Sequence, residues 1–294
     1  MFKRIARFFY AELVPKAPPR MGSIVIALKI ILRDHFVNEY KEGAIRIVAM
    51  QGENLRIQRL NHRDIVHLDF LGHELLFVGT NFFLEGFTPI LGYVGHHTPK
   101  KGDIVVDGGA YVGFFTVIAA KLVGPTGRVL AFEPDPSNFE ELLENIRLNG
   151  IDNVIPIKAG LLDGDSISLL KANGDMGSTL QVDSAIEGSM IEIQVVSLDN
   201  EIKRRGIDKV DFIKLDVEGS ECRCLIGSSE ILEKNDVKLA IASYHIVDGD
   251  RSCARVEQIL RDMGYRSWTE YPSHLTTYGE RHAVSPVEMR TDLH

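Results

Sequence analysis

The chain has 294 residues, of which 45% are hydrophobic and 25% charged, and its formal net charge is −8. Such a composition is typical of a globular protein with a substantial core, and the negative charge argues against a protein that wraps nucleic acid through phosphate contacts. Three cysteines do not make a disulfide framework, and no cysteine or histidine pairs stand at zinc spacing. The apolar runs are too short for a spanning helix, so we expect a cytoplasmic protein with no nucleic-acid partner.

Residues 1–20 predict a short basic amphipathic helix. Apolar residues recur at helical spacing, Lys3, Arg4 and Arg7 fall between them, and Pro15 ends the pattern. Such a helix either docks on its own domain or touches an anionic membrane surface as a peripheral contact. Its short length favours docking, because little apolar area is available to hold it on lipid.

The next part of the chain changes character twice. Residues 21–37 predict a second helix, and residues 54–84 predict two or three short strands separated by polar residues and glycines. We therefore expect an N-terminal α+β extension over residues 1–84 and a separate domain over residues 85–294.

A regular alternation of strands and helices begins near residue 102. Short buried strands are expected at 104–107, 128–132, 154–158, 210–217 and 238–244, and helices at 114–123, 139–146, around 225–232 and at 256–263. Two further runs, 265–271 and 276–284, are expected to close the sheet as a hairpin. Strands that alternate with helical stripes predict a doubly wound, mostly parallel α/β sheet with both faces covered. Residues 1–100 and 160–195 are left as the extension and loops that shape an acceptor pocket.

A glycine-rich turn at residues 105–113 follows the first of these strands. This edge of a parallel sheet is where ligands bind, and Gly109 and Gly113 allow a close approach of the backbone. The dinucleotide-binding fingerprint requires glycines at its first, third and sixth positions. Counted from Gly108, the third position is Ala110, so the fingerprint fails.

Two carboxylates stand at neighbouring strand ends. Asp107 opens the glycine turn, and Glu133 follows the second strand, just before Pro134. A carboxylate in the second position accepts hydrogen bonds from ribose hydroxyls, and one in the first suits a cationic ligand. The pair predicts binding of a nucleoside with a positive end, such as S-adenosylmethionine. The alternative is that both carboxylates only cap the helices that follow them.

These residues carry a likeness to a known family. The chain resembles the FkbM-type methyltransferases, a branch of the class I S-adenosylmethionine-dependent enzymes, through VDGGAYVG at 106–113, AFEP at 131–134, VSLD at 196–199 and DFIKLDVEGSE at 211–221. The likeness covers about residues 85–270. It implies a seven-stranded sheet with an antiparallel last strand, and methyl transfer to a hydroxyl oxygen of a sugar, polyketide or other small molecule. It also implies a cofactor site formed by Asp107, Gly108, Gly109, Ala110, Tyr111, Gly113, Glu133 and Pro134. For the acidic residue that contacts adenine, Asp163 is the candidate.

The expected catalytic residues are Lys214, Asp216, Glu218 and His245. The first three alternate along the expected fourth strand and so share one side near its carboxyl end, and His245 ends the fifth strand. We assign His245 as general base, because its ordinary pKa of about 6.5 suits that task. Asp216 would hold the acceptor or the cofactor's ammonium group, and Lys214 would stabilise an alkoxide or neutralise Asp216. No metal is assigned. One alternative is a divalent-metal site at Asp216, Glu218 and His245; another is a merely structural ion pair between Lys214 and Asp216.

Two other functions compete with an O-methyltransferase. The first is a non-catalytic, methyltransferase-like nucleoside-binding module, which would need neither His245 nor Asp216. The second is a nicotinamide-dependent oxidoreductase, against which the failed dinucleotide fingerprint counts.

Overall fold

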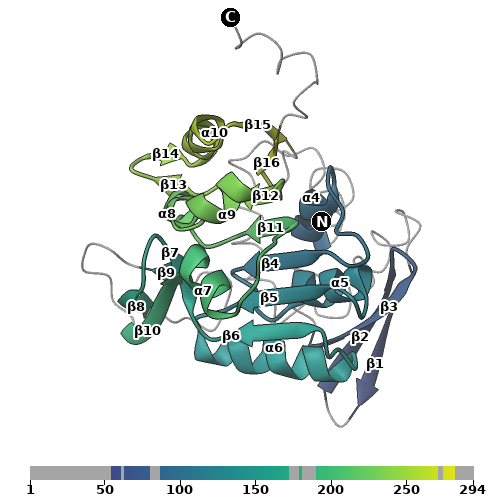
Figure 1. Cartoon of the computed structure of the whole chain (residues 1–294). Helices are drawn as coiled ribbons and strands as arrows, with labels where there is room; N and C mark the ends of the chain where they lie inside the picture. Colours follow the sequence, from purple (N-terminus) through teal and green to yellow (C-terminus); the bar gives the residue numbers. More distant parts are fainter. Residues whose placement is uncertain are drawn as a thin grey trace, which may run out of the picture.

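Three sheets organise the part of the chain that the computed structural model describes, which comprises residues 54–60, 63–79, 87–171, 179–180, 190–270 and 274–281. A seven-stranded sheet forms the centre. A three-stranded sheet and a four-stranded sheet lie on opposite sides of it in the view of Figure 1. The helices predicted within residues 1–37 lie outside the described residues. None of the described helices has the length and apolar character that crossing a membrane requires.

The central sheet has the strand order β15-β16-β12-β11-β4-β5-β6. Neighbouring strands are parallel except β16, which is antiparallel to both β12 and β15. This arrangement confirms the doubly wound sheet, its seven strands and its antiparallel last strand. The strands are β4 (Ile104–Gly108), β5 (Arg128–Phe132), β6 (Val154–Ile157), β11 (Phe212–Leu215), β12 (Lys238–Ala242), β15 (Tyr265–Glu270) and β16 (Thr276–Arg281).

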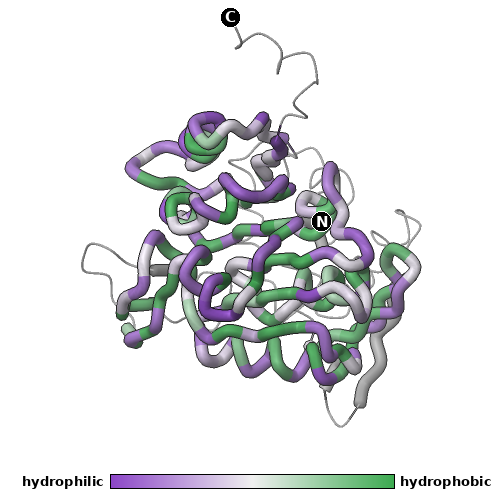
Figure 2. The backbone as a smooth tube through the Cα atoms, viewed as in Figure 1, coloured by the Kyte–Doolittle hydropathy of each residue, from purple (hydrophilic) through white to green (hydrophobic). Residues whose placement is uncertain are grey.

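Helices cover both faces of this sheet. One face carries α4 (Phe87–Val94), α5 (Phe114–Val123) and α6 (Pro136–Leu148); the other carries α7 (Leu198–Arg204), α8 (Glu221–Ile226), α9 (Ser229–Lys234) and α10 (Cys253–Asp262). Successive strand residues point to opposite faces, so Val105 packs toward α5 while Val106 packs toward the second helix layer. Figure 2 shows the hydrophobic and hydrophilic segments that alternate along the amphipathic α6.

Local signals set the helix boundaries. Helix α5 ends as predicted, with Gly124 at a φ of 64°, and α6 begins with Asp135 as its cap, whose carboxylate accepts the backbone N–H groups of Ser137 and Asn138. The segment predicted around 225–232 is two short helices, α8 and α9. Helices α4 and α7 were not predicted.

A three-stranded antiparallel sheet precedes the central sheet. Its strands are β1 (Asn54–Leu60), β2 (Arg63–Phe70) and β3 (His73–Val78), which confirms the expected short strands. Val66, Leu68 and Phe77 pack against Phe114 and Val117 of α5 in one hydrophobic cluster. The small sheet thereby extends the core on the α5 side of the molecule.

Polar contacts complete the docking of this sheet. Asn145 accepts the backbone N–H of Val78, and Asn149 pairs with both the N–H and the carbonyl of Leu76. Because Asn145 and Asn149 stand four residues apart on α6, they lie on one helix face and satisfy the backbone of β3.

The second small sheet was missed. Residues 160–195 were treated as loop, yet they contain strands in the order β7-β10-β8-β9. The strands are β7 (Gly160–Leu162), β8 (Ser166–Lys171), β9 (Thr179–Leu180) and β10 (Met190–Ser197), and a hairpin of β13 (Ile246–Val247) and β14 (Asp250–Arg251) follows β12. Strands of two or three residues carry too little periodicity to be recognised in a sequence. Polar and apolar residues do alternate from Ser166 to Leu169, and this pattern could have indicated strand β8.

Candidate active site

The glycine turn follows β4 and contacts the ends of its two neighbouring strands, β5 and β11. Gly109 has a φ of 74°, and the backbone N–H groups of Gly109 and Ala110 donate to the carbonyl of Phe132 at 3.1 and 2.8 Å. A Cβ on Gly109 would lie 1.9 Å from the carbonyl oxygen of Asp216. Only glycine fits such an approach, and it places Asp216 directly beside the turn, as the sequence predicted.

A buried ion pair lies beneath the turn. The register sets Lys214 opposite Asp107, and the Lys214 Nζ donates to Asp107 Oδ1 at 2.9 Å and to the Gly109 carbonyl at 2.8 Å. Thr116 donates to the other Asp107 oxygen at 2.5 Å. The predicted pairing of Lys214 with Asp216 is therefore wrong: both Lys214 and Asp107 point to the α5 face. Asp107 is fully buried and holds the turn in place.

Glu133 lies at the end of β5, buried beside the turn. Its Oε2 accepts the backbone N–H of Tyr111 at 2.7 Å and its Oε1 accepts that of Asp135 at 2.9 Å, across Pro134. Burial raises the pKa of Glu133 to about 7, although hydrogen bonds from the backbone of Asp135 and Tyr111 and from the Asn138 side chain act in the opposite direction. A carboxylate oxygen accepts more than one hydrogen bond, so both oxygens keep capacity for a ligand donor.

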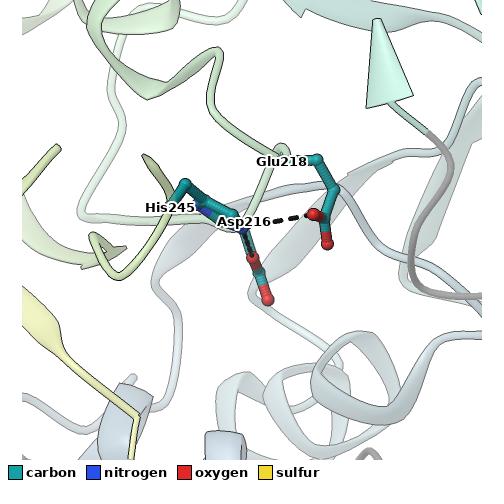
Figure 3. Close-up of side chains that lie close together, drawn as sticks. All are labelled: Asp216, Glu218 and His245. Carbon is teal, nitrogen blue, oxygen red and sulfur yellow. Dashed lines mark ion pairs between the residues drawn. The ribbon is translucent and has the colours of Figure 1, made fainter. Parts of the chain in front are cut away.

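Four titratable side chains, which we call the acidic cluster, meet where β11 and β12 end: Asp216, Glu218, Glu221 and His245. The His245 Nε2 lies 3.3 Å from Glu218 Oε2 and 3.7 Å from Asp216 Oδ1, and its Nδ1 lies 2.9 Å from Glu221 Oε1. Figure 3 shows Asp216 and Glu218 both directed at the His245 ring. Because β11 ends at Leu215, the cluster is assembled by the turns after the strands rather than by alternation along β11.

Charge in this cluster changes the predicted role of His245. Burial would lower the pKa of His245, but the carboxylates of Glu218 and Glu221, with Asp216 beyond them, raise it to about 11. The assumption of an ordinary histidine pKa is therefore wrong for this arrangement, and His245 is an imidazolium at neutral pH. Burial and the charge of Asp216 raise the pKa of Glu218. Burial also opposes ionisation of Asp216, but Lys214 and His245 keep its pKa below the ordinary value.

Three aromatic side chains border Asp216 and were not predicted. Tyr93 donates to Asp216 Oδ2 at 2.6 Å, Tyr244 donates to Oδ1 at 3.3 Å, and the His274 Nε2 lies 4.0 Å from Oδ2. Burial lowers the pKa of His274 to about 4, so it is neutral. Tyr93 comes from α4, far from Asp216 in sequence, and no motif identifies it. Glu221 was missed although it ends the block DFIKLDVEGSE.

The candidate adenine contact has a different partner in the structure. Arg223 donates from Nε and Nη2 to the two carboxylate oxygens of Asp163, at 3.1 and 2.7 Å. The side chains of Arg223 and Asp163 are 41% and 38% exposed, and the role of Asp163 in contacting adenine stays a prediction.

Comparison with known proteins places the chain in a family. A model of the FkbM methyltransferase domain matches residues 107–267. The chain is 32% identical, over 56% of its length and 74% of the relative's, to 31-O-demethyl-FK506 methyltransferase FkbM of Streptomyces tacrolimicus. It is 33% identical to hexuronic acid methyltransferase AglP of Haloferax volcanii, over 50% of this chain and 57% of that protein. A crystal structure of an FkbM methyltransferase from Methylobacillus flagellatus KT has a TM-score of 0.46 and 21% identity, covering 68% and 52% of the two chains.

The chain belongs to the FkbM methyltransferase family.

Proposed function

We propose that this protein transfers the methyl group of S-adenosylmethionine to a hydroxyl oxygen of a small molecule or sugar. The observation that carries the proposal is the position of the acidic cluster directly beside the glycine turn, with the Asp216 carbonyl against Gly109. Relatives named for a 31-O-demethyl macrolide and for a hexuronic acid support an oxygen acceptor. These relatives are matched over 74% and 57% of their own lengths, and the acceptor class is part of the proposal.

The residues around the turn fit the cofactor. Glu133 is buried beside the turn and accepts the backbone N–H groups of Tyr111 and Asp135, and its oxygens have capacity for a further donor such as a ribose hydroxyl. We assign the ribose to Glu133 and the remaining contacts to the backbone of residues 108–113. S-adenosylmethionine supplies an activated methyl group on a sulfonium.

The acidic cluster handles the acceptor. Glu218 accepts the hydrogen bond of its hydroxyl and, with Asp216 beside it, holds the oxygen in line with the methyl carbon, which is the main requirement of this displacement. A C–O bond forms as the C–S bond breaks, with the electron pair kept by sulfur, and the hydroxyl proton passes to Glu218. His245, as an imidazolium, keeps these carboxylates in place. A module that only binds nucleosides would have no use for this cluster.

A labelled-methyl assay tests the proposal. The full chain is incubated with S-adenosylmethionine carrying a ¹³C methyl group and a panel of sugars, uronic acids and polyhydroxylated macrocycles, and products are identified by mass spectrometry. We expect a labelled methyl ether together with S-adenosylhomocysteine, and a loss of turnover of about 100-fold or more in Asp216→Asn. Label on nitrogen or carbon, or turnover unchanged in Asp216→Asn, would contradict the assignment.

A further inference from the structure

The acidic cluster carries more negative charge than its own side chains neutralise. Three carboxylates, Asp216, Glu218 and Glu221, surround the single imidazole of His245. With His245 as an imidazolium these carboxylates leave a surplus of two negative charges; with His245 as the neutral imidazole that binds a metal they leave three, which one dication reduces to one. Lys214, an ammonium close by, is bound to Asp107 at 2.9 Å. Buried charge of one sign is either paired or coordinates a metal, so the surplus points to a missing dication.

We propose that Asp216, Glu218 and His245 bind one divalent transition-metal cation. One ligand atom from each of these side chains lies within 4.8 Å of the others. Metal–ligand bonds of about 2.1 Å bring neighbouring ligand atoms to roughly 3.0–3.5 Å from one another. The separations of 3.3 Å between His245 and Glu218 and of 3.7 Å between His245 and Asp216 are close to that spacing. Small side-chain shifts complete the site.

The orientation of the His245 ring is independent support. Its side chain is only 9% exposed, and neither ring nitrogen makes a hydrogen bond of acceptable geometry despite the nearby carboxylates. Oxygens that share a metal with Nε2 lie about 45° off the nitrogen's lone-pair axis, which spoils a hydrogen bond but leaves the axis free for a cation. The buried Nε2 lies near both carboxylates, 3.3 Å from Glu218 and 3.7 Å from Asp216, without a hydrogen bond to either.

Glu221 supplies the outer support that a metal-binding histidine uses. It is fully buried, its Oε1 lies 2.9 Å from the His245 Nδ1, and the same oxygen accepts the backbone N–H groups of Val217 and Gly219. A small turn of the ring would let Nδ1 donate to this oxygen, and such a carboxylate fixes a histidine ring and raises the basicity of its other nitrogen toward a metal. Glu221 is thus a positioning residue held by the turn that carries Glu218.

The ligand set indicates the kind of metal. Carboxylates alone suit Mg²⁺ or Ca²⁺, whereas an imidazole with two carboxylates favours Mn²⁺, Fe²⁺ or Zn²⁺. Three protein ligands leave positions open, and Glu218, which is 23% exposed, lies at the accessible side. On the proposed function, the acceptor hydroxyl oxygen binds there, and the metal favours loss of its proton to the free oxygen of Glu218.

Metal binding to the full chain tests the site directly. The protein is stripped with a chelator and titrated with Mn²⁺ alone, followed by calorimetry and by the electron paramagnetic resonance of free Mn²⁺. We expect one bound ion per chain and an affinity at least 30-fold weaker in Glu218→Gln and in His245→Gln. Glu230→Gln, which removes an exposed carboxylate of α9 that pairs with Lys203 and not with the cluster, is the matched control and should retain wild-type affinity.

Two further measurements separate the possible failures. Paramagnetic broadening of the His245 imidazole signal by Mn²⁺ in the wild-type chain tests the site without any variant that might misfold. Binding of S-adenosylmethionine to the stripped protein tests the proposed function alone. Cofactor binding with no Mn²⁺ or Zn²⁺ bound, or metal affinity equal in all variants, overturns the metal site and leaves the methyltransferase. Metal binding without cofactor binding overturns the proposed function instead.

Discussion

Gly109 combines two constraints that no other residue type satisfies. Its φ is 74°, and an added Cβ would meet the Asp216 carbonyl oxygen at 1.9 Å, a backbone atom that cannot rotate away. Gly109→Ala should therefore lower the free energy of unfolding by more than about 3 kcal/mol, through strain and through separation of β4 from β11. Urea denaturation measures the loss.

Gly150 offers a matched control for the strain alone. It has a φ of 60° but no atom within 4 Å of an added Cβ. Gly150→Ala should cost only about 1 kcal/mol, the penalty of a left-handed backbone for a residue with a side chain. Equal losses in the two variants would mean that the contact with Asp216 does not matter.

Glu133 makes stability depend on pH in an unusual direction. Burial raises its pKa from 4.5 to about 7. Between these two values the unfolded chain is ionised while the native carboxyl keeps its proton, so this residue makes the folded state less stable as pH rises. Glu133→Gln removes that dependence. Its stability relative to the wild type should rise by about 2 kcal/mol from pH 5 to pH 8.

Thermal or urea unfolding of both proteins across this pH range measures the difference. Glu140→Gln, on the exposed side of α6, controls for the loss of one negative charge and should show a smaller change. A difference between Glu133→Gln and wild type that stays flat from pH 5 to pH 8 would show that the native carboxyl ionises normally.

The junction between β4 and β11 depends on a buried ion pair. Lys214 and Asp107 are opposite each other in the register, and their side chains are 5% and 0% exposed. Lys214→Met leaves Asp107 buried without its cation, which should cost about 3–5 kcal/mol. Adding Asp107→Asn to that variant should restore part of the loss, because the uncompensated charge disappears.

An exposed ion pair provides the comparison for this junction. Lys203 and Glu230 lie on the surfaces of α7 and α9, with side chains 57% and 45% exposed. Lys203→Met should leave the unfolding midpoint nearly unchanged, because water screens such pairs. A similar small effect for Lys214→Met, measured by the same denaturation curves, would contradict a structural role for the buried pair.

At the scale of the whole molecule, the sequence predicted the central sheet well because its strands are buried on both faces and its helices are amphipathic. Helix α5 was predicted to the residue. The small sheet of β7 to β10 was missed, because β7 and β9 have only three and two residues and the pairing of β10 with β7 joins segments that are distant in sequence. Helices α4 and α7, each of eight residues or fewer, gave too little periodicity.

The site was predicted in its positions and not in its electrostatics. Parallel strands end at one edge, so Asp216 could be placed beside the glycine turn before any coordinates were known. The pairing of Lys214 with Asp107 and the charge on His245 depend on which way side chains point and on how deeply Glu221 is buried. Tyr93 reaches the site from α4 through packing that no local pattern records.

The central claim is that the carboxyl edge of this sheet binds S-adenosylmethionine through Glu133 and the glycine turn. Calorimetric titration of the full chain with S-adenosylmethionine, with nicotinamide dinucleotide as the comparison ligand, tests it most directly. We predict one molecule of S-adenosylmethionine bound per chain, at least tenfold weaker binding in Glu133→Gln, and no binding of the dinucleotide. A folded protein that binds neither S-adenosylmethionine nor S-adenosylhomocysteine would contradict it. So would a Glu133→Gln variant that binds these two ligands as tightly as the wild type does.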